Sequence, residues 1–174
     1  MIRYEVLTKE HKDVEEVRKF YDYSFPDDER MPYDRLLSMV DDNHVMYAWY
    51  DEEKLVGMTF TFVFDQLAYL SYICIQKEEQ NHGYGSKILN AIENMYSRIV
   101  VDIEQIKTEQ DEEQIRRKQF YLRNSFHETG VFYFIYNVDY ELLSTGESVT
   151  GDEWNALIHA FWGKFADTAV ITEK

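Results

Sequence analysis

The fold is decided by the apolar run Leu67-Ala68-Tyr69-Leu70-Ser71-Tyr72-Ile73-Cys74-Ile75 and by the stretch Gln80-Asn81-His82-Gly83-Tyr84-Gly85 that follows it. Apolar residues then recur at helical spacing, at Ile88, Leu89, Ile92 and Tyr96. The pattern predicts a strand over 67–75, a glycine turn, and a helix from 86 to about 96. A strand, a glycine turn and a helix N-terminus in this order can hold a phosphate with backbone N–H groups. The stretch therefore predicts a ligand that carries phosphate.

The composition is that of a folded domain with an acidic surface. The chain has 174 residues, of which 45% are hydrophobic, so it can bury the core of a single domain over 1–174. With 18 Lys and Arg against 33 Asp and Glu, the net charge is -15. Such a surface repels nucleic acid and anionic membrane lipid and suits a cationic small molecule. Solubility alone also explains acidity in many proteins, so the charge excludes partners more firmly than it selects one.

Cys74 is the single cysteine of the chain and cannot form an internal disulfide. It lies in an apolar run, so a buried, inert thiol is expected, and the cysteine count fits a reducing, cytoplasmic compartment. No apolar run approaches the ~20 residues that span a bilayer, and the N-terminal residues do not form a signal peptide. The cysteine and the histidines lack the spacing of metal ligands, so no metal is expected.

The remaining periodicities place helices and strands on both sides of the central stretch. Strands are predicted over 2–7, 45–50, 55–64, 99–103, 131–136 and 138–142, and helices over 14–25, from 32 to about 40, and over 115–122. Pro26 is expected to end the first helix. Trp154, Leu157, Ile158, Phe161, Trp162 and Phe165 mark a terminal amphipathic helix. The order β-α-α-β-β-β-α-β-α-β-β, with an extra C-terminal helix, predicts an α/β sandwich around a mixed sheet.

The glycine turn itself indicates which phosphate ligand fits. Gly83 and Gly85 lack a Cβ that would block a diphosphate, and the helix after them presents unpaired N–H groups and the positive end of its dipole. A lysine followed by Ser or Thr, as nucleoside triphosphate loops have, is missing, and so is the Gly-x-Gly-x-x-Gly pattern of dinucleotide sites. The alternative is that the two glycines merely turn the chain from strand to helix.

Two motifs resemble the GCN5-related N-acetyltransferase (GNAT) superfamily, and the element order resembles it over nearly the whole chain. Gln80-x-x-Gly83-x-Gly85 matches the family's Arg/Gln-x-x-Gly-x-Gly/Ala turn after the fourth strand. Phe120-Tyr121-x-x-Asn124-Ser125-Phe126, with Arg123 inside it, resembles the family's Phe-Tyr-x-Arg-x-Gly-Phe segment, and Ser125 stands where the family has glycine. The resemblance implies a mostly antiparallel central sheet flanked by helices, and an N-acetyltransferase that uses acetyl-CoA.

The resemblance also assigns the cofactor site by position. In the family, the amides of the turn hold the pyrophosphate of coenzyme A, and the preceding strand offers main-chain groups to the pantetheine arm. Carried over by position, the residues expected to bind the pantetheine arm are Ile73, Cys74 and Ile75. The residues expected around the pyrophosphate are Asn81, His82, Gly83, Tyr84, Gly85 and Ser86, and Gln80 of the same motif is also predicted to bind the cofactor. The side chains of Ile73 and Ile75 are expected to be ordinary core, because the predicted role concerns their backbone.

Tyr121 and Glu104 are the candidate catalytic residues. A thiolate leaving group needs a proton, which a phenol can supply, and the resemblance places Tyr121 beside the sulfur. An amine with a pKa of ~10.4 must lose a proton before it attacks, and Glu104, just past the strand over 99–103, can take it. The alternation of this strand puts Asp102 on the same face as Glu104. The alternatives are a core aromatic for Tyr121 and a solvated strand end for Glu104.

The segment Ser24-Phe25-Pro26-Asp27-Asp28-Glu29-Arg30 joins the first two helices, and the resemblance places it at the acceptor pocket. Its pattern Phe25-Pro26-x-x-Glu29-Arg30 resembles a bacterial subgroup of the superfamily. Its acids attract an amine, while Arg30 either pairs with Glu29 or anchors a substrate carboxylate. A capped, solvated turn is the alternative. Glu29 and Arg30 are therefore the candidate substrate residues, and the acceptor is expected to be a primary amine of a small molecule.

Three functions remain open at this point. The first is direct transfer of acetyl from acetyl-CoA to an amine, with the main-chain N–H near Ile75 polarising the thioester carbonyl. The second is a module that keeps the fold and binds acyl-CoA without turnover, since a fold does not imply a function. The third is an interaction protein, in which the aromatic helix around Trp154, Phe161 and Trp162 forms a contact such as that of a homodimer. The same stripe otherwise packs on the sheet.

Overall fold

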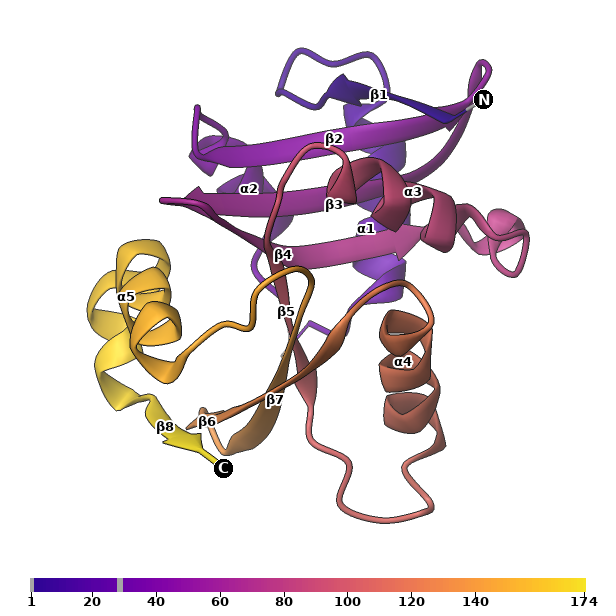
Figure 1. Ribbon diagram of the computed structural model, residues 1–174. Coiled ribbons are helices and arrows are strands. Elements are labelled where there is room, and N and C mark those ends of the chain that lie inside the picture. Colours follow the sequence, from indigo (N-terminus) through magenta and orange to yellow (C-terminus); the bar gives the residue numbers. More distant parts are fainter. Residues whose placement is uncertain (1, 28–29) are drawn as a thin grey trace. The chain divides into compact units, whose positions relative to one another are not determined.

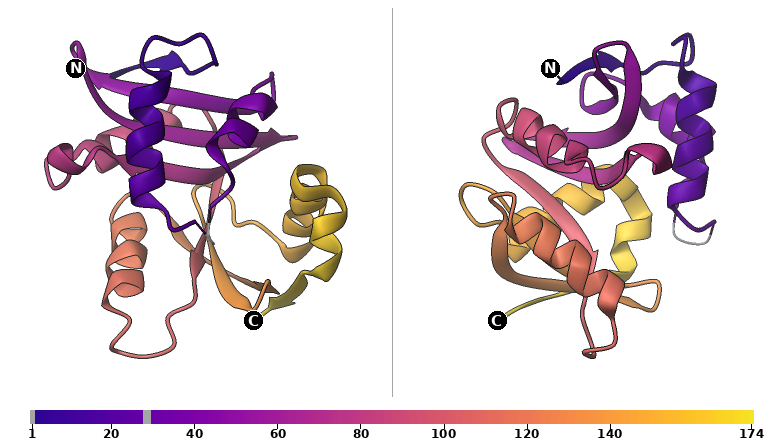
Figure 2. Two further views of the ribbon diagram at one scale, coloured as in Figure 1. Left: turned by 180° about the vertical axis from the view of Figure 1, so that it is seen from behind. Right: turned by 90° about the vertical axis from the view of Figure 1, so that its right-hand side faces the viewer.

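The computed structural model describes residues 2–27 and 30–174 as a mixed α/β fold (Figure 1, and from two further sides in Figure 2). Its strands are β1 (Ile2–Val6), β2 (His44–Asp51), β3 (Lys54–Phe64), β4 (Leu67–Ile75), β5 (Ile99–Glu104), β6 (His127–Ile135), β7 (Val138–Ser144) and β8 (Val170–Glu173). Its helices are α1 (Val14–Ser24), α2 (Tyr33–Met39), α3 (Tyr84–Glu93), α4 (Glu112–Leu122) and α5 (Gly151–Trp162), with short 3-10 segments η1 (Lys77–Glu79) and η2 (Gly163–Thr168). The strands follow the hydrogen-bonded order β1-β2-β3-β4-β5-β7-β6-β8. This confirms the predicted mixed, mostly antiparallel sheet flanked by helices.

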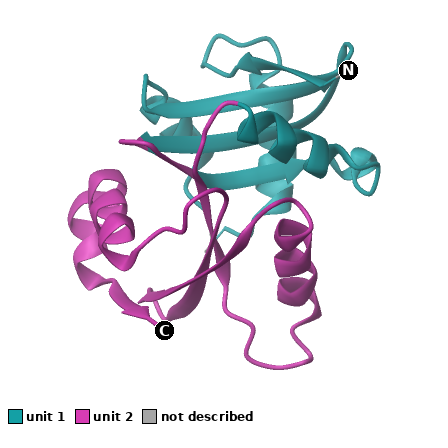
Figure 3. Cartoon of the chain, viewed as in Figure 1, with its two compact units in different colours: residues 1–63, 70–94 teal, residues 64–69, 95–174 magenta. Residues whose placement is uncertain are grey.

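The chain divides into two compact units (Figure 3). Unit 1 comprises residues 1–63 and 70–94, and unit 2 comprises residues 64–69 and 95–174. Strand β4 contributes residues 67–69 to unit 2 and its remainder to unit 1. Within unit 2, β4 pairs with β5 in parallel at Ala68↔Ile99 and Tyr69↔Val100. This parallel pair makes the sheet mixed.

In unit 1, helices cover both faces of the sheet (Figure 2). The pairs β1–β2 and β2–β3 are antiparallel. Helix α3 lies on one face. A Cβ added to Gly57 of β3 would meet the side chain of Ile88 from α3 at 3.3 Å and that of Ile75 from β4 at 3.0 Å. The opposite face carries α1, where the ring centroid of Tyr21 lies 5.3 Å from that of Tyr72. Alternation along β4 therefore directs Ile75 toward α3 and Tyr72 toward α1.

In unit 2, α4 and α5 lie on opposite faces of the antiparallel strands β5, β7, β6 and β8. Lys118 of α4 reaches Glu141 of β7, with an Nζ–Oε1 distance of 2.8 Å. The preceding β7 residue, Tyr140, faces the other side, where its ring stacks on that of Tyr133 at 4.9 Å. The fully buried Trp154 of α5 lies 5.2 Å from the same Tyr133 ring. The aromatic stripe of the terminal helix thus packs on the sheet through Trp154.

Local sequence explains two of the element boundaries. Phe25 precedes Pro26 and is extended, with φ −128° and ψ 129°, so α1 ends just before it. Tyr136 and Asn137 between β6 and β7 have φ values of 49° and 65°. Positive φ at both central residues defines the tight hairpin turn whose twist matches that of the strands it joins. The strands predicted over 131–136 and 138–142 thus pair as an antiparallel hairpin.

Other boundaries differ from the prediction. Strand β8 was not predicted, because its four residues are too few for an alternation to stand out. Strand β6 begins at His127 rather than at 131, since its first residues are polar and include Gly130, whose φ is 77°. The register between β6 and β7 also shifts in this region. The terminal helix ends at Trp162, so Phe165 lies beyond it in η2.

Candidate functional site

The glycine turn of unit 1 takes a conformation that favours glycine. Asn81 and Gly83 have φ values of 65° and 79°, and Gly83 is the N-cap of α3. The helix begins at Tyr84 and not at Ser86 as predicted, because the left-handed Gly83 turns the chain directly into the helix. Gly85 therefore lies in the first helical turn rather than in the loop.

The N-terminus of α3 offers backbone donors to an anion. Among the described residues no side chain caps this end, and the Lys87 N–H donates to the Gly83 carbonyl at 3.2 Å. The N–H groups of Tyr84, Gly85 and Ser86 precede that bond and have no acceptor within the helix. A Cβ added to Gly83 would meet nothing within 4 Å, so the space over the turn is open. Open donors at the positive end of a helix dipole fit a diphosphate such as that of coenzyme A.

Neighbouring side chains of unit 1 fix this turn. Gln80 Nε2 donates to the Ile75 carbonyl at 3.3 Å and ties the turn to the end of β4. The Tyr84 hydroxyl donates to Asp51 at 2.9 Å, and this hydrogen bond raises the pKa of Tyr84. Lys87 Nζ lies 4.7 Å from the centroid of the Tyr84 ring. A cation is therefore kept beside the helix N-terminus, where it adds to the attraction for an anion.

Ile73, Cys74 and Ile75 are the last residues of β4, next to the turn. The backbone of β3 approaches β4 closely here, since a Cβ on Gly57 would lie 2.6 Å from the Cys74 carbonyl oxygen. The Cys74 side chain is buried, and burial raises the pKa of its thiol to about 12. The thiol is therefore the inert one expected from the sequence.

Tyr121 lies in the last turn of α4 in unit 2, with 7% of its surface exposed. Its ring centroid is 5.3 Å from that of Phe120 and 5.1 Å from that of Phe126. The N–H groups of Asn124 and Phe126 donate to the Tyr121 carbonyl at 2.9 and 3.3 Å. Between them, Ser125 has a φ of 66°. Serine thus adopts the left-handed conformation for which glycine is suited, and the turn after Tyr121 closes without glycine.

The surroundings of the Tyr121 hydroxyl favour its protonated form. Burial raises its pKa far above the ordinary value, and the positive charge of Arg117 opposes that rise only in part. The charge of Asp102 raises it further. A phenol that stays protonated over the neutral range can serve as a hydrogen-bond donor or a general acid.

Asp102 and Glu104 are two residues apart on β5, but their side chains contact different elements. Glu104 ends the strand, and its Oε2 accepts a hydrogen bond from Gln114 Nε2 at 2.8 Å. Asp102 accepts hydrogen bonds from the hydroxyls of Tyr69, at 2.9 Å, and Tyr133. Burial raises the pKa of the Asp102 carboxyl, and the hydrogen bonds from Tyr133 and Tyr69 oppose this rise. The two carboxylates are therefore chemically distinct.

Arg30 is engaged within the turn between α1 and α2. Its guanidinium pairs with Asp22 at 3.3 Å and with Asp27, and it donates to the Phe25 carbonyl. Only 16% of the side chain is exposed. These contacts stabilise the turn. A substrate carboxylate could pair with Arg30 only by displacing Asp22 or Asp27 from it. The other candidate substrate residue, Glu29, lies outside the described residues.

The same turn is held to β4 through Met31. Its carbonyl accepts a hydrogen bond from the Tyr21 hydroxyl at 2.8 Å, and its N–H donates to the Tyr72 hydroxyl at 2.9 Å. The ring centroid of Phe25 lies 5.1 Å from that of Tyr72. Two tyrosines, one from α1 and one from β4, thereby position the chain that was predicted to border the acceptor.

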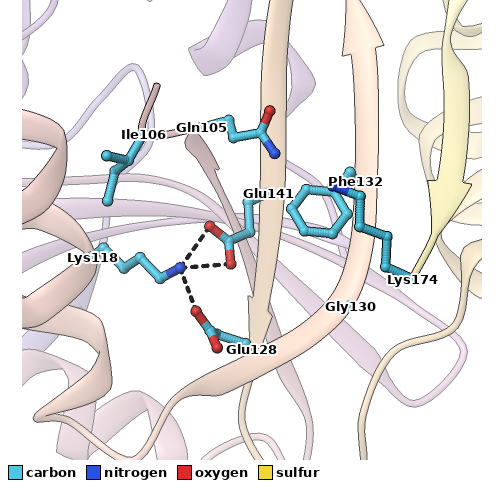
Figure 4. A pocket seen from close by; sticks show the side chains of 8 residues that line it. All are labelled: Gln105, Ile106, Lys118, Glu128, Gly130, Phe132, Glu141 and Lys174. Carbon is cyan, nitrogen blue, oxygen red and sulfur yellow. Dashed lines mark hydrogen bonds and ion pairs between the residues drawn. The ribbon is translucent and has the colours of Figure 1, made fainter. Parts of the chain in front are cut away.

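A pocket of about 320 Å³ opens on the α4 side of unit 2 (Figure 4). It is lined by Gln105, Ile106, Lys118, Glu128, Gly130, Phe132, Glu141 and Lys174. Lys118 Nζ donates to both carboxylate oxygens of Glu141, at 2.8 and 2.9 Å, and pairs with Glu128. Burial opposes the charge of Lys118, but the two glutamates outweigh it and raise the pKa. Lys118 is engaged by both glutamates, so this pocket is a poor candidate for the reaction.

The candidate residues fall into two sets. The predicted cofactor residues belong to unit 1, and the predicted catalytic residues Tyr121 and Glu104 belong to unit 2. Tyr69 and Tyr133 were not predicted as partners of Asp102. No sequence signal could find Tyr133, because β6 is separated from β5 by β7 and its register follows from the folded sheet.

Residues 2–27 and 30–174 lack two kinds of feature. No helix in these ranges is both long and apolar enough to cross a membrane. No group of three or more His, Cys, Asp or Glu side chains there could hold a metal ion.

Comparison with known protein families identifies one family. The sequence profile of the Acetyltransferase (GNAT) family matches residues 11–126. No curated protein sequence matches the chain. Among solved structures, a protein assigned to the GNAT acetyltransferases from Bacteroides thetaiotaomicron is similar, with a TM-score of 0.75 and 20% identity over 92% of this chain and 97% of that one.

Two further solved structures resemble the chain. The spermidine/spermine N-acetyltransferase SpeG from Vibrio cholerae has a TM-score of 0.60 and 17% identity, over 83% of this chain and 93% of that one. An acetyltransferase from Bacillus subtilis in complex with CoA has a TM-score of 0.60 and 15% identity, over 84% of this chain and 99% of that one. At such identities the likeness concerns the fold.

Proposed function

Since the chain belongs to the acetyltransferase (GNAT) family, we propose that it transfers the acetyl group of acetyl-CoA to a primary amine of a small molecule. The amine attacks the thioester directly while both substrates are bound. The observation that carries the proposal is the open N-terminus of α3 behind the left-handed Gly83. The two units act as one N-acetyltransferase domain over 1–174, and the single cysteine favours a cytoplasmic setting.

The turn and the end of β4 bind acetyl-CoA. The N–H groups of Tyr84, Gly85 and Ser86 hold the diphosphate, and the left-handed Gly83 keeps the space over them free. The main chain of residues 73–75 pairs with the pantetheine arm, and the N–H near Ile75 polarises the thioester carbonyl. When bound, acetyl-CoA supplies an acyl carbon that the amine nitrogen can attack.

Tyr121 donates the proton that the departing sulfur needs. The C–S bond breaks as the tetrahedral intermediate collapses, and the thiolate takes the proton of the phenol. Burial supports this role, because it keeps the Tyr121 hydroxyl protonated at neutral pH. The nitrogen of the intermediate gives a second N–H proton to solvent, and Tyr121 regains a proton from solvent after coenzyme A has left.

A carboxylate on β5 takes the proton that the amine loses. Glu104 is the candidate that the sequence indicates, at the end of the strand, and Gln114 orients it through a 2.8 Å hydrogen bond. The carboxylate accepts the proton directly or through one water. The overall reaction is balanced: the ammonium form of the acceptor and acetyl-CoA give the amide, coenzyme A and one proton.

Charge supports a cationic acceptor. The net charge of -15 attracts protonated amines over a long range and repels acidic ones. Arg30 is already paired with Asp22 and Asp27, so it is a weaker anchor for a substrate carboxylate than the sequence alone suggests.

Isothermal titration of acetyl-CoA and of free coenzyme A tests the cofactor site first. We expect micromolar binding of both ligands, abolished by Gly83→Trp, because the indole would fill the open space over the turn. Gly163→Trp is the matched control, since Gly163 also has a positive φ, of 59°, and nothing within 4 Å of an added Cβ. Binding that survives in Gly83→Trp, or that is absent in the unmodified chain, would overturn the proposed function.

A further inference from the structure

The inward face of helix α4 in unit 2 is mainly polar. Residues at positions i, i+4 and i+7 of a helix share a face, and on α4 these are Gln114, Lys118 and Tyr121. Within residues 112–122, all of which the structure describes, Tyr121 alone is buried. Helices α3 and α5, by contrast, each bury several large apolar side chains. Apolar contact therefore does little to fix the position of α4 on the sheet.

Two polar contacts join α4 to the strands of unit 2 instead. Gln114 Nε2 donates to Glu104 of β5 at 2.8 Å. Lys118 Nζ donates to both carboxylate oxygens of Glu141 on β7, at 2.8 and 2.9 Å, and pairs with Glu128 of β6 (Figure 4). An ammonium group has three N–H donors, and here all three point to carboxylate oxygens. Because these bonds reach two strands, they restrict both the rotation of α4 and its shift along its axis.

The ion pair of Lys118 with Glu141 is buried, which decides what it contributes. The two side chains are 16% and 7% exposed. Replacing such a pair by apolar side chains often leaves stability unchanged or raises it, so stability alone does not account for the pair. A buried charge that has lost its partner is strongly destabilising, however. Positions of α4 that separate the two groups are thus disfavoured, and the pair selects one position of the helix.

Tyr121 depends on the position of α4 more than other buried side chains do. It follows Lys118 by three residues, about one helical turn. Its hydroxyl forms no hydrogen bond with any residue that the structure describes. Of its two ring neighbours, Phe120 belongs to the same helix, and the contact with Phe126 is between rings. The place of the hydroxyl therefore follows from where α4 lies.

We infer that Lys118 is a positioning residue, which holds α4 through Glu141 and Glu128 so that the Tyr121 hydroxyl stays where the departing sulfur needs its proton. The inference rests on the proposed acetyl transfer and adds to it a residue that contacts neither substrate. A displacement of about 1 Å can lower a rate about 100-fold. The residues proposed to bind acetyl-CoA belong to unit 1, so its affinity should not depend on Lys118. The expected signature is a loss of turnover without a loss of affinity.

The test variant combines Lys118→Met with Glu141→Leu. Lys118→Met alone would leave two glutamates facing each other, whereas the double variant removes one charge of each sign and keeps the net charge of -15. It should fold, because apolar side chains of similar size replace the buried pair. We expect steady-state turnover to fall about 10- to 100-fold, with an unchanged Kd for acetyl-CoA in isothermal titration. Lys118→Arg keeps a cation between the glutamates and should retain more turnover than the double variant.

Lys107→Met combined with Asp139→Leu is the matched control. It removes a pair of the same kind, with a distance of 2.8 Å, that also ends on β7 but has both side chains exposed and does not involve α4. Turnover of this control should equal that of the unmodified chain. Equal losses in the two double variants, full turnover in Lys118→Met with Glu141→Leu, or a loss in Lys118→Arg as large as in that variant overturns the inference.

A measurement on Tyr121 itself does not require turnover. Protein labelled with carbon-13 tyrosine gives one set of ring signals per tyrosine, and Tyr121→Phe identifies the signal of Tyr121. We expect this signal to shift or broaden in Lys118→Met with Glu141→Leu, while that of Tyr33, buried in unit 1, stays in place. An unchanged Tyr121 signal, or equal changes in all tyrosine signals, contradicts a positioning role.

Failure of the inference and failure of the proposed function have different signatures. If the Tyr121 signal changes alone but the unmodified chain does not bind acetyl-CoA, Lys118 positions Tyr121 and the acetyltransferase proposal fails. If the unmodified chain acetylates an amine and Lys118→Met with Glu141→Leu does so at the full rate, the proposed function stands and the inference is wrong.

Discussion

The guanidinium of Arg98 donates hydrogen bonds to both carboxylate oxygens of Glu153, with Nη1–Oε1 and Nη2–Oε2 distances of 2.8 and 3.0 Å. Glu153 lies in the first turn of α5 and also accepts the N–H of Thr150 at 2.9 Å, which completes a capping box. The hydrogen bonds from Arg98 hold the pKa of the Glu153 carboxyl at about 2. One side chain thereby joins the start of β5 to the start of α5.

Replacing Glu153 by Gln should destabilise the protein by roughly 1 kcal/mol at pH 7, a value reduced by solvent screening of the half-exposed carboxylate. The folded-state pKa lies below the ordinary value of 4.5, so the stabilisation is present above pH 4.5 and is lost as the pH falls toward 2. Urea unfolding of both proteins across this range should show the difference shrinking. Glu113→Gln, which breaks a weaker pair with Arg117 at 3.4 Å, is the control. A constant difference down to low pH would contradict the assignment.

Tyr121→Phe should separate catalysis from cofactor binding. Loss of the phenolic proton should lower turnover by about 10²–10⁴-fold, while acetyl-CoA binds as before. Steady-state rates and isothermal titration on the same preparation measure the two effects. Tyr136→Phe removes a hydroxyl from a residue that is 66% exposed, and it should leave both unchanged. Full activity in Tyr121→Phe would show that another group protonates the sulfur.

Ser125→Gly should stabilise the protein, by about 0.5–1 kcal/mol. A serine at φ 66° carries the steric cost of the left-handed conformation, and glycine relieves it at a smaller cost in unfolded-chain entropy. Chemical denaturation measures the gain, and Ser125→Ala, which keeps the strain, is the comparison. If both variants behave alike, the turn after Tyr121 is not strained.

Gly57→Ala should disturb the end of β4. The added Cβ would lie 2.6 Å from the Cys74 carbonyl oxygen, which is a backbone atom, so a strand must shift and stability should fall by about 1–3 kcal/mol. Acetyl-CoA affinity should fall with Gly57→Ala as well, since the shift occurs in the predicted pantetheine-binding strand. Unchanged stability and affinity would argue against close packing here.

Much of the fold follows from local pattern in the sequence. The strand over 67–75 was predicted with its observed limits. The apolar run marks the strand itself, and the glycine turn after it marks where the strand ends. Pro26 likewise marks the end of α1. The start of α3 was misplaced by two residues because sequence cannot show that Gly83 adopts φ 79° and begins the helix itself.

The candidate site was only partly accessible to such reasoning. The alternation of β5 grouped Asp102 with Glu104, and Glu104 was favoured because that residue ends the strand. Burial and the bonds from Tyr69 and Tyr133 distinguish Asp102, and these depend on contacts over 33 and 31 residues of sequence. Likewise, the engagement of Arg30 with Asp22 appears only once α1 and the following turn are folded.

The burial of Cys74 has a practical consequence. It is the only thiol of the chain, and its pKa of about 12 leaves almost no thiolate at neutral pH. A colorimetric thiol reagent would therefore detect released coenzyme A without a background signal from the folded protein. The same reagent would react with Cys74 once β4 opens, so one titration in denaturant would count unfolded molecules without a label.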